Sequence, residues 1–215
     1  MMNQIDRDDL LNILDVLVNE LGLCNFFTDD RRTKTHDLYD WAAEHNLAKR
    51  FNMCVATGAT KGVLVFDDRD WVIKFRLTDA DRDYCRKEYE NYVRAEDAGL
   101  SYYFAETVYL CEYHGVEFYA QENVECDESV ESQIVDSLQR SYDEDGTPYD
   151  VEDLWNEAED MDACARVHYL YDDDDLVKFI NDNHINDLHS GNFGTKGDHY
   201  VIIDFSGFGR AVWGE

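Results

Sequence analysis

Hydrophobic residues in the first part of the chain recur at helical spacing up to about residue 50. Leu10, Leu14, Leu17 and Leu21 form one stripe between residues 8 and 22, with acidic side chains in the first turn. A polar break follows, and a second helical pattern begins around Leu38. The pattern therefore predicts two amphipathic helices that pack on whatever follows them.

From residue 51 the periodicity becomes that of short strands. Three β-rich segments, NMCVATGA, KGVLVFDD and DWVIKFRL, are separated by turn-forming residues. A helix is predicted over about residues 80–98, with Gly99 as its stop signal. Two more strands, ETVYLCEY and VEFYAQENV, meet at a turn around His114 and Gly115. Residues 51–125 thus read as β-β-β-α-β-β.

The remainder of the chain is predicted to be helical between residues 127 and 182. Val151, Leu154 and Ala158 give one apolar face to a very acidic stretch. The end, HINDLHSGNFG followed by HYVIIDFSGFG, predicts a loop, a short strand pair and a final loop. We divide the chain into a helical extension packed on the body (1–50), a β-rich part (51–125) and an acidic helical part (126–215).

The net charge of the chain is strongly negative and unevenly distributed, and this bears on which partners we expect. The 215 residues carry a formal net charge of −29. Residues 1–94 hold 14 basic and 18 acidic side chains, whereas residues 95–215 hold 5 basic and 30 acidic. Such a surface repels nucleic acid and anionic membranes and attracts basic partners. The simpler alternative is a solvated face that keeps the protein in solution.

Composition also narrows the cellular setting that we expect. The chain has no apolar run near the roughly 18 residues that span a membrane, and its acidic, amphipathic N-terminus resembles neither a secretory signal nor a transit peptide. The six cysteines are scattered, without C-x-x-C pairs or zinc spacing. We therefore expect a soluble cytoplasmic protein with reduced, mostly buried thiols.

Candidate chemistry in the β-rich part begins with a glycine-containing loop, ATGATKGV, between its first two strands. Lys74 follows twelve residues after Gly62 and is the only charge in WVIKF, where strand alternation points it inward. The next helix offers Glu88, which shares a stripe with two tyrosines, and Glu90, about 200° around the helix. Taken in isolation, the glycine-containing loop could be an ordinary hairpin turn, and Lys74 could be a lysine that faces solvent. We favour Glu88 over Glu90 as the partner of Lys74.

A second group of polar residues lies near the C-terminal end. Asp187 and Asn192 stand five apart in the segment DLHSGN, which follows a predicted helix. Twelve residues after Asn192, Asp204 ends the apolar strand VIID and is followed by Phe205 and Ser206. Helix-capping and turn aspartates are the alternative explanation for each motif by itself.

In this order and spacing, the motifs resemble those of the protein-kinase-like superfamily over residues 51–210. The DLHSGN form is closer to aminoglycoside-phosphotransferase-like enzymes than to ordinary Ser/Thr kinases. The resemblance implies an α+β, two-lobed protein-kinase-like fold with a five-stranded antiparallel N-lobe sheet and a reduced helical C-lobe. The chain departs from the family pattern at Ala56, where the loop usually has its first glycine, at Ile185, where histidine is usual, and at Ser206, where the D-F-G glycine is usual.

The resemblance also assigns roles to individual residues. Lys74 would pair with the α- and β-phosphates of ATP, Glu88 would hold the lysine, and Asp187 would accept or orient the attacking hydroxyl. Asn192 and Asp204 would bind Mg²⁺. Ala120 would be a small gatekeeper at the end of the fifth strand. Backbone contacts to the nucleotide would come from the glycine-containing loop (Gly58, Ala59, Thr60 and Gly62) and from the linker after the fifth strand (Glu122 and Val124).

Two functions follow from this resemblance. The first is a Mg-ATP-dependent phosphotransferase. Because eleven residues follow Asp204, we do not expect a full peptide-docking half. The acidic surface favours a cationic substrate or a basic protein as the phosphoryl acceptor. The second is a kinase-derived, catalytically weak or inactive acidic protein that captures or inhibits a basic partner, for example a nucleic-acid-binding protein. Compact chains of this kind resemble those of phages and bacteria, which would place a phage-encoded member in the host cytoplasm.

Overall fold

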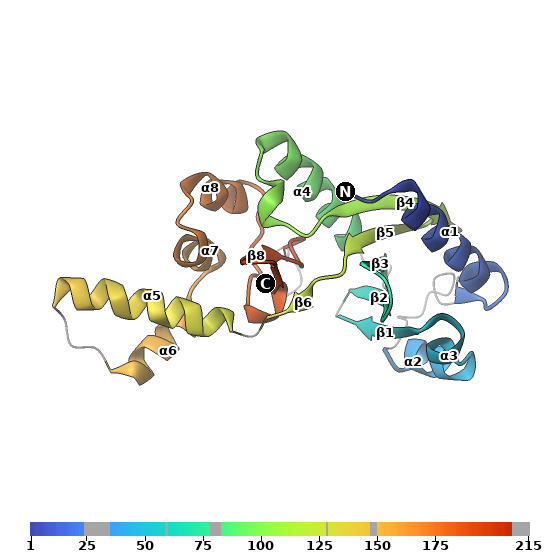
Figure 1. The fold of residues 1–215 in the computed structure, drawn as a ribbon, viewed down its shortest axis with the longest axis horizontal. Coiled ribbons are helices and arrows are strands. Elements are labelled where there is room, and N and C mark those ends of the chain that lie inside the picture. The colour runs from blue at the N-terminus through green and yellow to red at the C-terminus, as the bar shows by residue number, and fades with distance from the viewer. Residues whose placement is uncertain (24–34, 59, 78–82, 128, 147–149, 208–215) are drawn as a thin grey trace, which may run out of the picture. The chain divides into compact units, whose positions relative to one another are not determined.

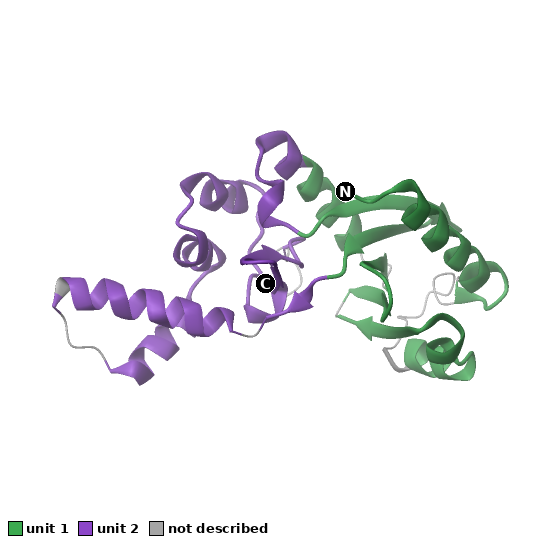
Figure 2. Cartoon of the chain, in the orientation of Figure 1, with its two compact units in different colours: residues 1–93, 105–123 green, residues 94–104, 124–215 purple. Residues whose placement is uncertain are grey.

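The computed structural model describes residues 1–23, 35–58, 60–77, 83–127, 129–146 and 150–207. Figure 1 shows its helices and strands, and Figure 2 shows the two compact units into which it divides. Unit 1 comprises residues 1–93 and 105–123, and unit 2 comprises residues 94–104 and 124–215. The sequence-based division instead placed a boundary after residue 125 and kept residues 94–104 with the β-rich part.

Unit 1 is built on a five-stranded antiparallel sheet with the strand order β1-β2-β3-β5-β4. Its strands are β1 (Met53–Thr57), β2 (Lys61–Phe66), β3 (Trp71–Arg76), β4 (Thr107–Tyr113) and β5 (Val116–Glu122). The turn between β4 and β5 places His114 and Gly115 at φ 51° and 77°, the left-handed conformation that two-residue hairpin turns require. The fold class α+β and the five-stranded antiparallel sheet are therefore as predicted.

Helices α1 (Gln4–Asn19), α2 (Thr35–Glu44) and α3 (Leu47–Phe51) share the core of this sheet. Leu14 and Leu17 of α1 are fully buried in the same apolar cluster as Phe66, Ile73 and Phe118. Burial of large apolar side chains is the main favourable term in such packing. The N-terminal helices are thus part of the hydrophobic core of unit 1.

Helix α4 (Tyr84–Ala98) begins in unit 1 and passes into unit 2 after Val93. Asp83 caps its first turn, because the Asp83 Oδ1 atom accepts hydrogen bonds from the backbone N–H groups of Cys85 at 3.0 Å and Arg86 at 3.1 Å. The cap fixes where the helix starts, and so which of its side chains face β2 and β3.

Unit 2 combines helices with a three-stranded antiparallel sheet in the order β6-β7-β8. Its elements are η2 (Ser101–Tyr103), β6 (Glu125–Cys126), α5 (Val130–Asp145), α6 (Val151–Asp160), α7 (Ala163–Tyr171), α8 (Asp174–Asp182), η3 (Ser190–Asn192), β7 (Phe193–Lys196) and β8 (His199–Ile202). The predicted helical stretch and the predicted C-terminal strand pair are both present.

A buried arginine joins three helices of unit 2. Arg166 on α7 is 4% exposed and forms an ion pair with Glu131 on α5. Its Nη2 atom also donates to the backbone oxygens of Ala158 at 2.7 Å and Glu159 at 3.0 Å, at the end of α6. A planar guanidinium suits several fixed acceptors at once, so Arg166 explains how a strongly acidic segment packs.

The thiols differ from the expectation. The described cysteines are all free, in agreement with reduced thiols, but Cys85 is the one that is buried. Cys54 and Cys126 are exposed, so the prediction of mostly buried thiols is wrong; Cys24 lies outside the described residues. Within the described part of the chain, no helix is long and apolar enough to cross a membrane.

Candidate functional site

Lys74 and Glu88 form a buried ion pair in unit 1. The Lys74 Nζ atom lies 3.1 Å from the Glu88 Oε2 atom, and the two side chains are 9% and 0% exposed. Lys74 projects from β3 on the side opposite the apolar core, where α4 brings Glu88 to it. Of the two glutamates that the sequence left open, Glu88 is the one inside the structure, whereas Glu90 is exposed.

Sequence reasoning missed a second lysine at the same carboxylate. The Lys61 Nζ atom lies 2.6 Å from the Glu88 Oε1 atom, and the Lys61 side chain is 10% exposed. Val63 pairs with Lys74 across β2 and β3, and Lys61 lies two residues before Val63, so strand alternation puts both lysines on one face. That alternation was visible in the sequence, but the pairing register was needed to apply it.

The charged cluster affects the thiol beside it. Burial raises the pKa of Cys85 well above its ordinary value, and among the charges around it Lys61 has the largest effect, in the opposite direction. Glu88, Asp83 and Lys74 also act on this thiol. Cys85 is thus an uncharged neighbour of the lysine–glutamate cluster.

The glycine-containing loop is a tight hairpin connection. The backbone N–H of Gly58 donates to the oxygen of Lys61 at 2.9 Å, and the oxygen of Thr60 accepts from Leu77 at 2.9 Å. Gly62 packs directly on Phe75, because a Cβ atom there would meet the phenyl ring at 2.5 Å. Ala59, the remaining predicted loop contact, lies outside the described residues.

In the predicted linker, residues 121–124, part of the backbone is already hydrogen-bonded within the protein. The N–H of Glu122 donates to the oxygen of Glu106 at 2.8 Å, so this group is not available to a ligand. Ala120, the predicted gatekeeper, is fully buried. Val124 packs where a Gly194 side chain would stand, and it belongs to unit 2, whereas Glu122 belongs to unit 1.

In unit 2 the loop before β7 joins Asp187 to Asn192. The Asn192 Nδ2 atom donates to the backbone oxygen of Asp187, and Asn192 is 7% exposed. Because the amide nitrogen is used in this way, the Asn192 Oδ1 atom is the one that can serve as a ligand. Ile185, at the position where the protein-kinase-like pattern would have histidine, is 1% exposed and fills an apolar position.

The β7–β8 hairpin brings Asp204 next to this loop. Phe193 pairs with Ile202, and the N–H of Ile203 donates to the oxygen of Asn192 at 2.9 Å. Asp204 follows directly, and its Oδ1 atom accepts from the Ser206 hydroxyl at 3.3 Å. The spacing of twelve residues between Asn192 and Asp204 is therefore the length of one short hairpin.

Phe205 and Gly207 hold the segment after Asp204 in place. Phe205 is fully buried and packs edge to face on Phe104, with ring centroids 5.0 Å apart. Gly207 has φ 67°, and a Cβ atom there would collide with the backbone oxygen of His184. Glycine is therefore required at position 207 by its left-handed backbone and by the close His184 carbonyl. The sequence motif shows only that the glycine stands one position later than usual.

Asn192 and Asp204 supply oxygen ligands, which suit Mg²⁺. The described residues contain no group of three or more His, Cys, Asp or Glu side chains that could hold a metal ion. Mg²⁺ typically takes one or two protein carboxylates together with substrate phosphates and water, so two protein ligands fit this cation better than they fit zinc or a calcium cage.

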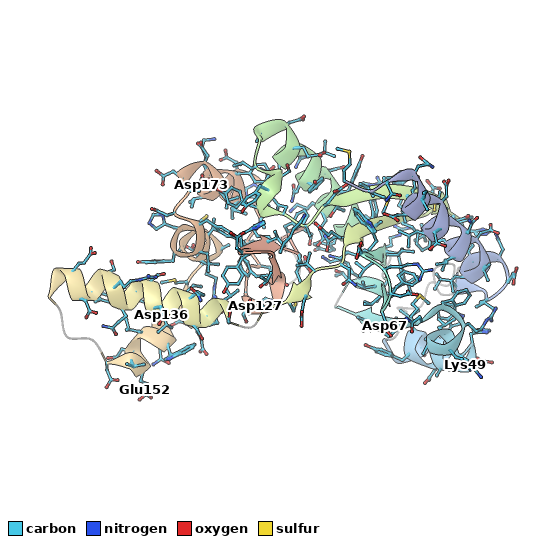
Figure 3. The ribbon with its side chains drawn as sticks, viewed as in Figure 1. Lys49, Asp67, Asp127, Asp136, Glu152 and Asp173 are labelled. Carbon is cyan, nitrogen blue, oxygen red and sulfur yellow. The ribbon has the colours of Figure 1, made fainter. Side chains whose placement is uncertain are left out.

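Many of the acidic side chains of unit 2 lie on or next to its helices. Figure 3 labels three examples, Asp136 on α5, Glu152 on α6 and Asp173 immediately before α8. On α6, Val151 is 56% exposed and Trp155 is 39% exposed, and they lie one turn apart. Glu152 and Glu159 flank Trp155 at helical spacing and are exposed.

The structure thus brings together the predicted site residues within each unit: Lys74 with Glu88 in unit 1, and Asp187, Asn192 and Asp204 in unit 2. In each group the residues lie fewer than twenty positions apart in the chain and are joined by strand register, helix packing or one short hairpin. Comparison with known proteins adds no assignment, because no protein family model, curated protein or solved structure matches this chain.

Proposed function

We propose that this protein is a Mg-ATP-dependent phosphotransferase of the protein-kinase-like superfamily, with units 1 and 2 as its two lobes. The observation that carries the proposal is the buried ion pair between Lys74 and Glu88. Burying two charges costs several kcal/mol per ion, and an apolar pair of similar size is often at least as stable. A buried lysine on a central strand is therefore better explained by a bound anion than by stability.

The proposed roles follow from the chemistry of each group. Lys74, held by Glu88, contacts the phosphates of ATP, and the Asn192 and Asp204 oxygens hold Mg²⁺, which would neutralise phosphate charge. Asp187 accepts or orients the hydroxyl of the acceptor. The strongly acidic composition of unit 2 favours a cationic acceptor or a basic protein.

Thermal unfolding with ATP, with Mg²⁺ and with both ligands tests the proposal. At about 100 times Kd a ligand stabilises a protein by about 2.7 kcal/mol, which raises the Tm of a chain of this size by about 5–10 °C. We expect this shift only with both ligands in the wild type, and its loss in Asp204→Ala.

Asp198→Ala is the matched control, because Asp198 is a fully exposed aspartate in the turn of the same hairpin. It should keep the wild-type shift. If millimolar Mg-ATP leaves the wild-type Tm unchanged, the enzyme proposal is wrong.

A second candidate function rests on the exposed Trp155 and its flanking carboxylates. Arginine stacks on aromatic faces and pairs with carboxylates, so α6 suits a basic protein segment. In this function the protein captures or inhibits a basic partner without phosphoryl transfer. Binding of an arginine-rich peptide that weakens steeply with salt and is lost in Trp155→Ala supports this candidate; equal binding by Trp155→Ala contradicts it.

A further inference from the structure

The Glu88 carboxylate gathers two buried lysines into one place. Lys61 contacts Oε1 and Lys74 contacts Oε2, so both ammonium groups lie beside the two oxygens of a single side chain. The lysines come from different strands, and neither is close in sequence to Glu88. Their convergence is a product of the fold.

The strand register makes this arrangement rigid. Lys61 and Lys74 occupy the same face of the β2–β3 pair, and the opposite face, with Leu64, Ile73 and Phe75, is packed in the core. Gly62 lies against Phe75 and allows no side chain without displacing that ring. The position of Lys61 is therefore set by the core, although Lys61 directly follows a loop.

Two convergent ammonium groups match the chemistry of a phosphate chain. Each lysine is a compact positive charge with three N–H donors, and adjacent phosphates present several acceptor oxygens and negative charges. Lys61 is the first residue of β2 and Lys74 lies on the neighbouring β3, so the match to a phosphate chain rests on these two side chains.

We infer that Lys61 is a second phosphate-binding lysine, and that Lys61 and Lys74, oriented by Glu88, form a two-lysine site for the phosphate chain of the nucleotide. This inference rests on the proposed function and adds to it a residue to which the motif pattern assigns no role.

Binding of Mg-ATP and of inorganic triphosphate to the full chain tests the inference by calorimetry. We expect Lys61→Gln and Lys74→Gln each to weaken the affinity for both ligands at least tenfold. Lys49→Gln, which removes an exposed lysine of α3 (Figure 3), should bind like the wild type. Far-UV circular dichroism and Tm establish that each variant is folded.

The outcomes separate the inference from the proposed function. If Lys61→Gln binds both ligands like the wild type while Lys74→Gln does not, Lys61 has only a structural role and the inference is wrong, whereas the proposed function stands. If the wild type binds neither ligand at millimolar concentration, both are wrong.

Removal of a buried charge can also prevent folding, so a second measurement uses the wild-type chain. NMR of the lysine Cε–Hε groups, with and without triphosphate, reports which lysines the ligand contacts. Shifts of both Lys61 and Lys74, with Lys49 unchanged, support the inference. A shift of Lys74 alone contradicts it.

Discussion

Among the single residues, Glu88 has the most unusual environment. Its carboxylate is completely buried and accepts from two lysines, at 2.6 and 3.1 Å. A carboxylate in this position is costly unless its charge is matched. Because the ammonium groups of Lys61 and Lys74 both contact this carboxylate, substitution of Glu88 should affect folding stability and ligand binding together.

Glu88→Gln tests this dependence. Removing one partner of a buried ion pair typically costs about 3–5 kcal/mol, so we expect the free energy of unfolding to fall by about that amount in denaturant titrations. Glu90→Gln, at an exposed position of the same helix, should change it by less than about 0.5 kcal/mol. Equal effects of the two substitutions would show that the glutamates have been assigned wrongly.

Gly207 is the second residue whose substitution should be informative. It has φ 67° and no room for a Cβ atom beside the His184 carbonyl, whereas Gly197 has the same φ with nothing within 4 Å of that position. Gly197→Ala therefore pays only for the left-handed conformation, about 1–2 kcal/mol. We expect Gly207→Ala to lower the free energy of unfolding by clearly more, and similar losses in the two variants would contradict the close packing.

At the scale of elements, short local connections position the groups of unit 2. The β7–β8 hairpin sets Asn192 beside Asp204, and the Asp173 side chain caps α8 by accepting from the N–H groups of Asp175 and Leu176, each at 3.0 Å. The Tyr103 hydroxyl of η2 also donates to Asp173 at 2.6 Å. One aspartate thus starts a helix and ties it to a distant segment.

This arrangement predicts a specific acid sensitivity. The Tyr103 hydrogen bond, with help from the capped N–H groups, lowers the pKa of Asp173 below its ordinary value of 3.8. A lowered pKa gives stability that is fully present above pH 3.8 and is lost as the pH falls below it towards the folded-state pKa. The Tm of the wild type should therefore fall more between about pH 5 and pH 3 than that of Asp173→Asn, which keeps a capping side chain.

Tyr103→Phe provides the companion variant, because it removes the donor and leaves the carboxylate. It should also flatten the acid dependence of Tm relative to the wild type. The explanation fails if both variants retain the wild-type dependence.

At the scale of the whole molecule, the net charge of −29 dominates the electrostatics. Like charges repel across the surface of the folded protein, and salt reduces this repulsion because the Debye length falls from about 30 Å at 0.01 M to about 8 Å at 0.15 M. We expect Tm to rise over this range of NaCl concentration, and to rise equally with KCl. A constant or falling Tm would show that surface ion pairs outweigh the repulsion.

The candidate site could be predicted from the sequence where its residues are linked by short, regular elements. Asn192 and Asp204 are joined by one hairpin, so their spacing carried the information. The pairing of Lys74 with Glu88 was predicted from a strand and the helix that follows it. Glu88 was preferred to Glu90 because it lies on the same helical stripe as Tyr84 and Tyr92. Lys61 could not be found in this way, because its role depends on the register between two strands and on a helix that begins more than twenty residues later.

By itself, then, the sequence determined most of the order of helices and strands (α3 and β6 excepted), the antiparallel sheet, the uneven charge and the spacing of the candidate site residues, because periodicity, turns and composition act locally. Only the tertiary structure decided that Lys61 shares Glu88, that Gly207 lies against His184 and that residues 94–104 belong to unit 2. These features depend on burial and on contacts between distant segments, which exist only once the chain has packed.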